Sequence, residues 1–418
     1  MMKGPSLRFL QSQGIPFPAL KEELLKDVVD FYKGYSLSKE DVVPISDSWK
    51  GNPCVLYGHL YTTYQEIAQT PGFVTDISTK DKFISESGDV LMPTSDVTPK
   101  GLATATCILF SGALIGGDIN ILRPKKILDG RYLSLIINSR KDKLYPLIVG
   151  STVRHLHANS LKGLKYFFPC LEEQQKIAAF FTALDEKIHN LETQLEEIDK
   201  FKNGLFGCIF STKKIKEWNR SKFSQEFEFK RTFSLSRKEI STDKCIDGEE
   251  IKIIHYGDIL TKYGDIVDPQ KDQIGYALTK LSVEDEDYLK DGDIVFADAA
   301  EDYSVGKAIE MVGINSGVLS GLHTIAATPK NRFASGYLSY YFNSQIFKKQ
   351  VKTLSVGTKV MSLTKSAIKT TDIYYPSIEE QEKISSLFSL LDEKRKVAIK
   401  RLLLEKQLKK AFMQQMFV

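Results

Sequence analysis

Two stretches of the chain carry apolar residues at alternating spacings of four and three, the pattern of a long amphipathic helix. The first stretch follows Pro169, and only Lys202 interrupts its series. Its apolar positions are Ile177, Phe181, Leu184, Ile188, Leu191, Leu195, Ile198, Leu205 and Ile209. A helix over residues 172–209 would be about 57 Å long at roughly 1.5 Å per residue. The spacing therefore predicts one long helix with a continuous seam for a partner helix.

The second stretch follows Pro376 and begins in the same register, with Ile384, Phe388 and Leu391. Arg395 then stands where the first stretch has Ile188. The apolar face resumes at Ala398, Leu402, Leu408 and Phe412. We expect the two helices, residues 171–212 and 377–418, to pack antiparallel as a coiled-coil spacer, because unmatched seams would otherwise be exposed. The alternative is that each helix pairs with a second chain in a dimer.

The segments before the two helices repeat each other in the same order. DFYKGYSLSKE (30–40) corresponds to EFKRTFSLSRK (228–238), YGHLYTTYQEI (57–67) to YGDILTKYGDI (256–266), YLSLIINS (132–139) to YLSYYFNS (337–344), and VGSTVRHL (149–156) to VGTKVMSL (356–363). The separation between matches only increases along the chain, which indicates one duplication with small insertions. Both segments are rich in Val, Ile, Tyr and Thr punctuated by Gly and Asp, typical of short strands and turns. We predict an α+β fold, with two similar globular domains (residues 1–170 and 213–376) at opposite ends of the antiparallel helices and an approximate two-fold axis.

The sequence lacks the motifs of the enzymes that most often act on DNA. None of the 27 glycines forms a Gly-x-Gly, which disfavours a Rossmann-type cofactor loop. No two prolines are adjacent, so the Asn/Asp-Pro-Pro-aromatic motif of amino-methyltransferases is absent. Glu301 stands where a P-loop ending at Gly306-Lys307 would need glycine. We therefore expect no enzyme, no catalytic residues and no cofactor. The alternative, a DNA methyltransferase, would have to bind S-adenosylmethionine.

Metal and membrane sites are not expected either. His155-x-His157 has no acidic or cysteine neighbour at ligand spacing, and the repeat replaces it with Ser362 and Thr364. The five cysteines show no zinc-finger or redox spacing, which favours a reducing, cytoplasmic environment. The longest apolar stretch, around residues 106–115, is shorter than the roughly 18–20 residues of a membrane span. We expect a cytoplasmic protein without a membrane segment.

Charge is uneven along the chain although the net value is only +4. The first helix holds eight Asp or Glu against four Lys, so it should repel phosphates and serve as a spacer and a docking surface for proteins. Residues 212–239 hold nine Lys or Arg and four Glu. Such a run is either a solvated basic stretch or a phosphate contact, and the sequence leaves both open.

Each helix begins with the same signature. PCLEEQQKIAAFFTALDEK (169–187) matches PSIEEQEKISSLFSLLDEK (376–394). Two variable modules, each followed by Pro-x-[Leu/Ile]-Glu-Glu-Gln and a long helix, resemble over essentially the whole chain the specificity subunit of type I restriction-modification systems. The resemblance implies that residues 1–170 and 213–376 are target recognition domains and that the helices act as a ruler between them. It also implies binding to double-stranded DNA, two methyltransferase (modification) subunits and restriction (translocase/nuclease) subunits. The implied partner-binding and seam residues are Glu173, Gln174, Ile177, Phe181, Leu184, Ile188, Leu191, Leu195, Glu380, Gln381, Ile384, Phe388 and Leu391.

Candidate DNA contacts are polar residues on loops that occupy equivalent places in both copies. In the first module they are Tyr57, Thr62, Thr63, Thr94, Ser95, Lys100, Ser151, Thr152 and Arg154. In the second they are Tyr256, Thr261, Lys262, Lys307, Thr358, Lys359 and Lys365. Arg154 and Lys359 are favoured, whereas for Tyr57 and Tyr256 a place in the core is the favoured interpretation, because repeated aromatic residues are more often core. A turn is the simpler explanation for Gly150 and Gly357.

Two modules that contact the same face of B-DNA would have centres about 34–36 Å apart, near one helical turn. Because the modules have diverged, we expect a split, non-palindromic target. A helical scaffold without DNA affinity, and an orphan allele that stores recognition modules, are the alternatives. The scaffold would show no salt-dependent DNA binding.

Overall fold

The computed structural model describes residues 5–45, 51–77, 84–242, 251–315, 317–357 and 359–417. The chain divides into two compact units. Unit 1 comprises Met1–Glu192 with Lys400–Val418, and unit 2 comprises Thr193–Ile399. The long helices α6 (Leu171–Ile209) and α12 (Ile378–Met416) each contribute a segment to both units. We call residues 1–170 module 1 and residues 213–376 module 2.

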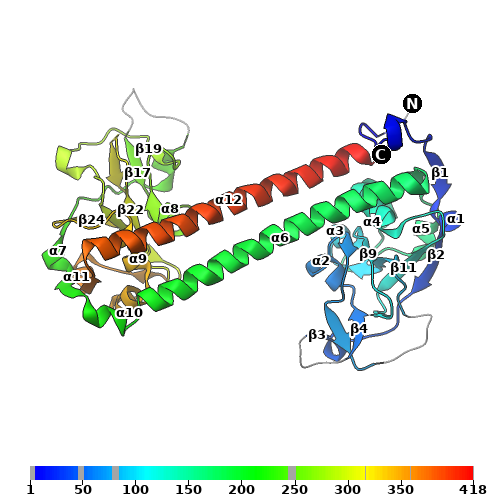
Figure 1. Cartoon of the computed structure of the whole chain (residues 1–418), viewed down its shortest axis with the longest axis horizontal. Coiled ribbons are helices and arrows are strands. Elements are labelled where there is room, and N and C mark those ends of the chain that lie inside the picture. Colours follow the sequence, from blue (N-terminus) through cyan, green and yellow to red (C-terminus); the bar gives the residue numbers. More distant parts are fainter. Residues whose placement is uncertain are drawn as a thin grey trace. The chain divides into compact units, whose positions relative to one another are not determined.

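Unit 1 contains a five-stranded sheet in the order β2-β11-β7-β9-β5, antiparallel except for the parallel pair β5–β9 (Figure 1). A four-stranded sheet follows the order β10-β4-β6-β3, with β10 and β4 parallel. The strands are β2 (Val29–Lys33), β3 (Val43–Pro44), β4 (Asn52–Val55), β5 (Ile67–Ala68), β6 (Phe73–Thr75), β7 (Val90–Pro93), β9 (Thr106–Ile108), β10 (Leu114–Ile115) and β11 (Ile119–Pro124).

Unit 2 repeats both sheets with the same strand order and the same parallel pairs. Its sheets run β15-β24-β20-β22-β18 and β16-β19-β17-β23. The strands are β15 (Phe227–Phe229), β16 (Ile240–Ser241), β17 (Lys252–Ile254), β18 (Ile266–Val267), β19 (Gly275–Ala277), β20 (Ile294–Ala297), β22 (Ala308–Met311), β23 (Val318–Ser320) and β24 (Thr324–Pro329). The duplicated α+β module predicted from the sequence is therefore confirmed in the fold.

Each module is joined to its long helix by a buried glutamine. In unit 1 the Gln174 side chain donates to the Pro169 carbonyl and accepts from the Asp129 amide, both at 2.9 Å. In unit 2 Gln381 donates to the Pro376 carbonyl and accepts from the Ala334 amide, both at 3.0 Å. Both glutamines are 1% exposed. The repeated Glu-Glu-Gln sequence thus fixes the start of each helix to the module that precedes it.

Within each unit the two long helices pair in opposite directions. In unit 1 Phe180 of α6 packs edge-on against Phe412 of α12, with ring centroids 5.0 Å apart. In unit 2 Phe206 of α6 packs against Phe388 of α12 at 4.2 Å. The seam residues also enter the module cores, because Ile177 and Phe181 belong to the core of unit 1, as Ile384, Phe388 and Leu391 do to that of unit 2. The pairing of helices within one chain is therefore confirmed in each unit.

A doubly paired lysine closes each of these helix–module junctions. In unit 1 Lys409 Nζ of α12 lies 2.6 Å from Glu66 Oε2 of the module and 2.6 Å from Asp185 Oδ1 of α6. Burial alone would lower the pKa of Lys409, but the attraction of both carboxylates outweighs it and the pKa is raised.

The same triad recurs in unit 2 at the residues that correspond in the repeat. Lys202 Nζ of α6 lies 2.9 Å from Asp265 Oδ2 of the module and 2.6 Å from Asp392 Oδ1 of α12. Lys202, which interrupts the apolar seam in the sequence, is therefore a structural residue with two counter-charges.

None of the helices in the described ranges combines the length and apolar character needed to cross a membrane.

Lys409→Met should destabilise unit 1 by about 3–5 kcal/mol, because it leaves two carboxylates close together without their cation. Lys406→Met is the matched control, since the Lys406–Glu192 ion pair is far more exposed and should contribute less than about 1 kcal/mol. Urea unfolding of the two variants measures the difference. Equal midpoints for both would show that the triad does not stabilise the junction.

Candidate functional site

The predicted contact residues of module 1 lie on loops that the fold brings together. The short strands β8 (Ser95–Asp96) and β12 (Arg154–His155) pair antiparallel, with Arg154 opposite Asp96 and His155 opposite Ser95. Arg154 Nη1 also donates to the Val97 carbonyl at 2.7 Å. Helix α3 (Pro99–Leu102) begins directly after this pair, and Thr98 caps it by accepting from the Gly101 amide. Ser95, Lys100 and Arg154 are thereby assembled into one surface.

A tight hairpin contains Arg154 and recurs in module 2. Its two ends, Val149 and His155, exchange backbone hydrogen bonds of 3.1 and 2.7 Å. Gly150 has a φ of 105°, and a Cβ there would collide with the Val153 carbonyl oxygen. The turn therefore requires glycine and presents Ser151 and Thr152 to solvent.

The corresponding hairpin of module 2 runs between Val356 and Ser362 with the same reciprocal bonds. Gly357 has a φ of 133° and a Cβ there would collide with the Val360 carbonyl oxygen. This hairpin exposes Lys359, and Thr358 lies outside the described residues.

The remaining candidates of module 1 surround helix α2 (His59–Thr62). Tyr57 is 40% exposed and its ring centroid lies 6.4 Å from that of Tyr61, so the repeated tyrosine belongs to the surface here. Tyr57 and Thr62 line a cavity of about 640 Å³ with Lys33 and Lys39. Thr62 uses its hydroxyl proton to bond the Gly58 carbonyl at 2.8 Å. Thr63 is exposed, whereas Thr94 is half-buried.

Most candidates of module 2 are bonded to their own unit. Tyr256 is half-buried against His323, with ring centroids 5.2 Å apart. Thr261 donates to the Gly257 carbonyl. Three lysines donate to backbone carbonyls: Lys262 to Gln273, Lys307 to Tyr263, and Lys365 to Lys230. Lys359 differs from these three, because it extends from the hairpin with no such bond among the residues described.

The residues assigned to partner binding lie mainly inside the units. Glu173 is 1% exposed and accepts from Arg8 Nε at 3.0 Å. Glu380 is half-buried and lies 3.0 Å from Lys214 Nζ. Leu184 and Ile188 are buried, and Leu191 and Leu195 are half-buried. These residues hold the helices and modules together within each unit.

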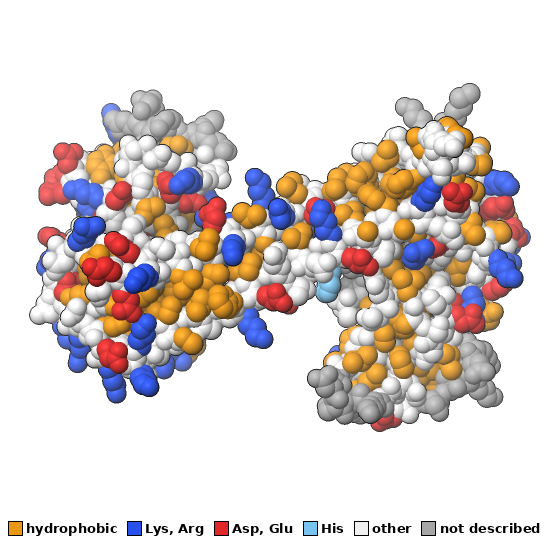
Figure 2. All heavy atoms as spheres, in the orientation of Figure 1, with side chains coloured by type: hydrophobic (Ala, Val, Ile, Leu, Met, Phe, Trp, Pro, Cys, Tyr) orange, Lys and Arg blue, Asp and Glu red, His pale blue; other side chains and the backbone are white. Residues whose placement is uncertain are grey.

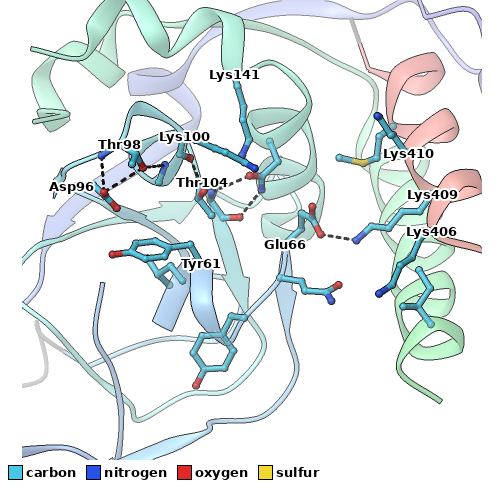
Figure 3. Close-up of a pocket in the computed structure, with 18 of the residues that line it drawn as sticks. Tyr61, Glu66, Asp96, Thr98, Lys100, Thr104, Lys141, Lys406, Lys409 and Lys410 are labelled. Atoms are coloured by element: carbon cyan, nitrogen blue, oxygen red, sulfur yellow. Dashed lines mark hydrogen bonds and ion pairs between the residues drawn. The ribbon is translucent and has the colours of Figure 1, made fainter. Parts of the chain in front are cut away.

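A second cavity in unit 1, of about 820 Å³, brings in residues that the sequence did not indicate (Figure 3). Tyr61 and Asp96 lie on its module side, and Lys141 and Lys410 also line it. Burial, aided by the nearby Asp96 carboxylate, raises the pKa of Tyr61 to about 12, which keeps its hydroxyl protonated as a donor. Lys141 and Lys410 could not be inferred from the duplication, because Ile346 and Asn203 occupy their corresponding positions.

Figure 2 shows Lys and Arg side chains interspersed with Asp and Glu on the visible face of both units, rather than gathered into one large basic field. In the described part of the chain no group of three His, Cys, Asp or Glu is placed to hold a metal ion. The imidazoles of His155 and His157 are nearly parallel, with ring centroids 6.0 Å apart. The polar surface around the loops is thus suited to hydrogen bonding and charge pairing.

Comparison with known proteins identifies relatives along most of the chain. The family described as "Type I restriction modification DNA specificity domain" matches twice, at residues 19–200 and 216–409. The MjaVIII type I restriction enzyme specificity subunit of Methanocaldococcus jannaschii is 24% identical over 391 residues, covering 88% of this chain and 86% of that protein. The putative MjaX specificity subunit of the same organism is 26% identical over 298 residues, or 67% of this chain and 65% of that one. The crystal structure of the type I S subunit from M. genitalium superposes with a TM-score of 0.60 at 16% identity, over 100% of this chain and 99% of that one, and so has the same fold.

Gly150→Ala should loosen the hairpin of module 1, because alanine at a positive φ costs about 1–2 kcal/mol before the collision with Val153 is counted. Amide hydrogen exchange at Val149 and His155 should accelerate roughly 5- to 30-fold. Gly163→Ala is the control, since Gly163 has an ordinary φ of −83° and a Cβ there would make only an ordinary contact, 3.9 Å from the Ser160 carbonyl oxygen. Equal exchange rates in both variants would contradict the proposed need for glycine.

Proposed function

This chain belongs to the type I restriction modification DNA specificity family, and we propose that it reads one half of a split DNA target with each module. The observation that carries the proposal is the combination of a repeated scaffold with unlike side chains on equivalent loops. Thr152 and Arg154 of the first hairpin correspond to Lys359 and Met361 of the second. Because the two modules share one scaffold but present different hydrogen-bond donors, each would recognise a different DNA sequence. The target is therefore asymmetric.

The hairpin residues supply donors suited to base edges and phosphates. An arginine has five N–H donors, so Arg154 keeps most of them after its bond to Val97 and can contact guanine O6 and N7. Lys359 carries a mobile point charge that suits a phosphate or a guanine edge. Ser151, Thr152 and Lys100 are exposed and add further donors in module 1.

We further propose that the chain performs no chemistry itself and directs methyltransferase and restriction subunits to its target. The known relatives are named specificity subunits of restriction enzymes, and the sequence has no cofactor or nuclease motif of its own. The repeated junctions at Gln174 and Gln381 create two equivalent helix–module surfaces, which suit two copies of one methyltransferase subunit. We propose a cytoplasmic location for this assembly, where it would meet both chromosomal and incoming DNA.

Arg154→Ala should relax sequence preference in the half-site read by module 1, at a cost of about 1–3 kcal/mol at one base pair. Lys359→Ala should affect the other half-site. The measurement is genome-wide mapping of methylated adenines in cells that carry the chain with its partner subunits.

Arg140→Ala serves as the control, because Arg140 is paired with Asp142 and is not among the candidate contacts. Exchange of residues 1–170 for another module should change one half of the methylated motif and leave the other intact. An unchanged motif in the Arg154 and Lys359 variants would assign recognition to other loops, and loss of both halves on module exchange would overturn the split reading.

A further inference from the structure

The cavity of about 820 Å³ in unit 1 is lined by five lysines: Lys100, Lys141, Lys406, Lys409 and Lys410. Its walls come from module 1, through α2, α3, α4 (Gly130–Ser139) and Lys141, and from Ile188 of α6 and the last turns of α12 (Figure 3). Glu66 and Asp96 are the two carboxylates among the lining residues. The cavity therefore has a surplus of positive charge.

Two of the five lysines are already neutralised. Lys409 lies between Glu66 and Asp185, and Lys406 Nζ lies 2.6 Å from Glu192 Oε1. Lys100, Lys141 and Lys410 have no ion pair with any residue in the described ranges. Glu66, the acid whose charge attracts Lys141, is already hydrogen-bonded to Lys409.

Lys141 is the most informative of the three because it is half-buried beside another cation. Burial lowers its pKa, the attraction of Glu66 opposes this, and the positive charge of Lys100 lowers it further. Holding a desolvated cation next to a like charge is unfavourable unless an anion completes the arrangement. A phosphate between Lys100 and Lys141 would remove both penalties.

The basic cavity is not required by the duplicated fold. In unit 2 the positions of Lys141, Lys406 and Lys410 are occupied by Ile346, Asp199 and Asn203. Only the lysine of the triad is kept, as Lys202. The triad serves structure in both units. Unit 2 lacks lysines at these three positions, although it brings Lys307 near Asp265 and Lys348 from other positions.

We propose that this cavity is a phosphate-binding site with Lys100, Lys141 and Lys410 as its ligands. The proposal rests on the function proposed above to the extent that the phosphates come from DNA. Lys100 belongs to α3, which directly follows the β8–β12 pair, so a strand contacted by Arg154 has its backbone within reach of this cavity. A free nucleotide offers the same chemistry, and the experiment separates the two sources.

The test uses the full chain with Lys100, Lys141 and Lys410 all changed to Gln. Affinity for a duplex carrying the target is measured over a series of salt concentrations. Loss of three phosphate contacts should reduce the slope of log K against log salt by about 3, close to 0.9 for each contact. The control changes Lys21, Lys26 and Lys400 to Gln, three exposed lysines of unit 1 outside the cavity, and should leave the slope unchanged. The double variant Lys100→Gln/Lys410→Gln removes only exposed side chains, so it should fold and lower the slope by about 2.

A second arm titrates ATP and inorganic pyrophosphate into the same proteins by calorimetry. A reduced DNA slope in the cavity variants alone assigns the site to the DNA backbone. Loss of ATP or pyrophosphate binding with an unchanged DNA slope assigns it to a free nucleotide. Equal behaviour of cavity and control variants in both arms overturns the site. If the wild-type chain shows no salt-dependent DNA binding, the proposed function fails, and the ATP arm still decides whether the cavity binds phosphate.

Discussion

A lysine held between two carboxylates is the interaction on which each unit depends. Taking three charged groups out of water is costly, and only mutual pairing offsets that cost. In each unit the lysine comes from the long helix that follows the other module: Lys409 completes unit 1 and Lys202 completes unit 2. The long helix can therefore pack at each junction only in the register that places its lysine between the two carboxylates. The apolar seam alone would tolerate a shift along the helix, and the triad removes that freedom.

Much of this architecture could be predicted from the sequence because it is periodic or repeated. The four-three spacing predicted both long helices, and the ordered matches predicted two modules of one fold. The triads could not be predicted, because Lys202, Asp265 and Asp392 are far apart in the sequence and come together only in the tertiary structure. In the sequence Lys202 is merely an interruption of the seam. The Glu-Glu-Gln starts were recognised as a signature, but the bonds that Gln174 and Gln381 make to their own modules depend on the tertiary structure.

The candidate site was predicted to the extent that its residues occupy equivalent loops. The hairpins that carry Arg154 and Lys359 follow a repeated Val-Gly sequence, so their common geometry has a sequence signal. Their roles as contacts remain predictions. Lys141 and Lys410 were missed for the opposite reason, since neither is repeated and they come from distant parts of the chain. Comparison of the two repeats identifies the features that the modules share, but it does not identify residues that occur in only one module.

Within each hairpin, the residues that set the backbone geometry differ from those that are exposed to solvent. Gly150 and Gly357 supply the backbone geometry, and the reciprocal bonds at the hairpin ends hold it closed. Among the described residues that follow the glycines, Ser151, Thr152 and Lys359 are exposed and do not pack into the core. Their identity can change with little effect on folding. These exposed positions can therefore be substituted without a compensating change in the core. New DNA sequence preferences could arise in this way by single amino-acid substitutions.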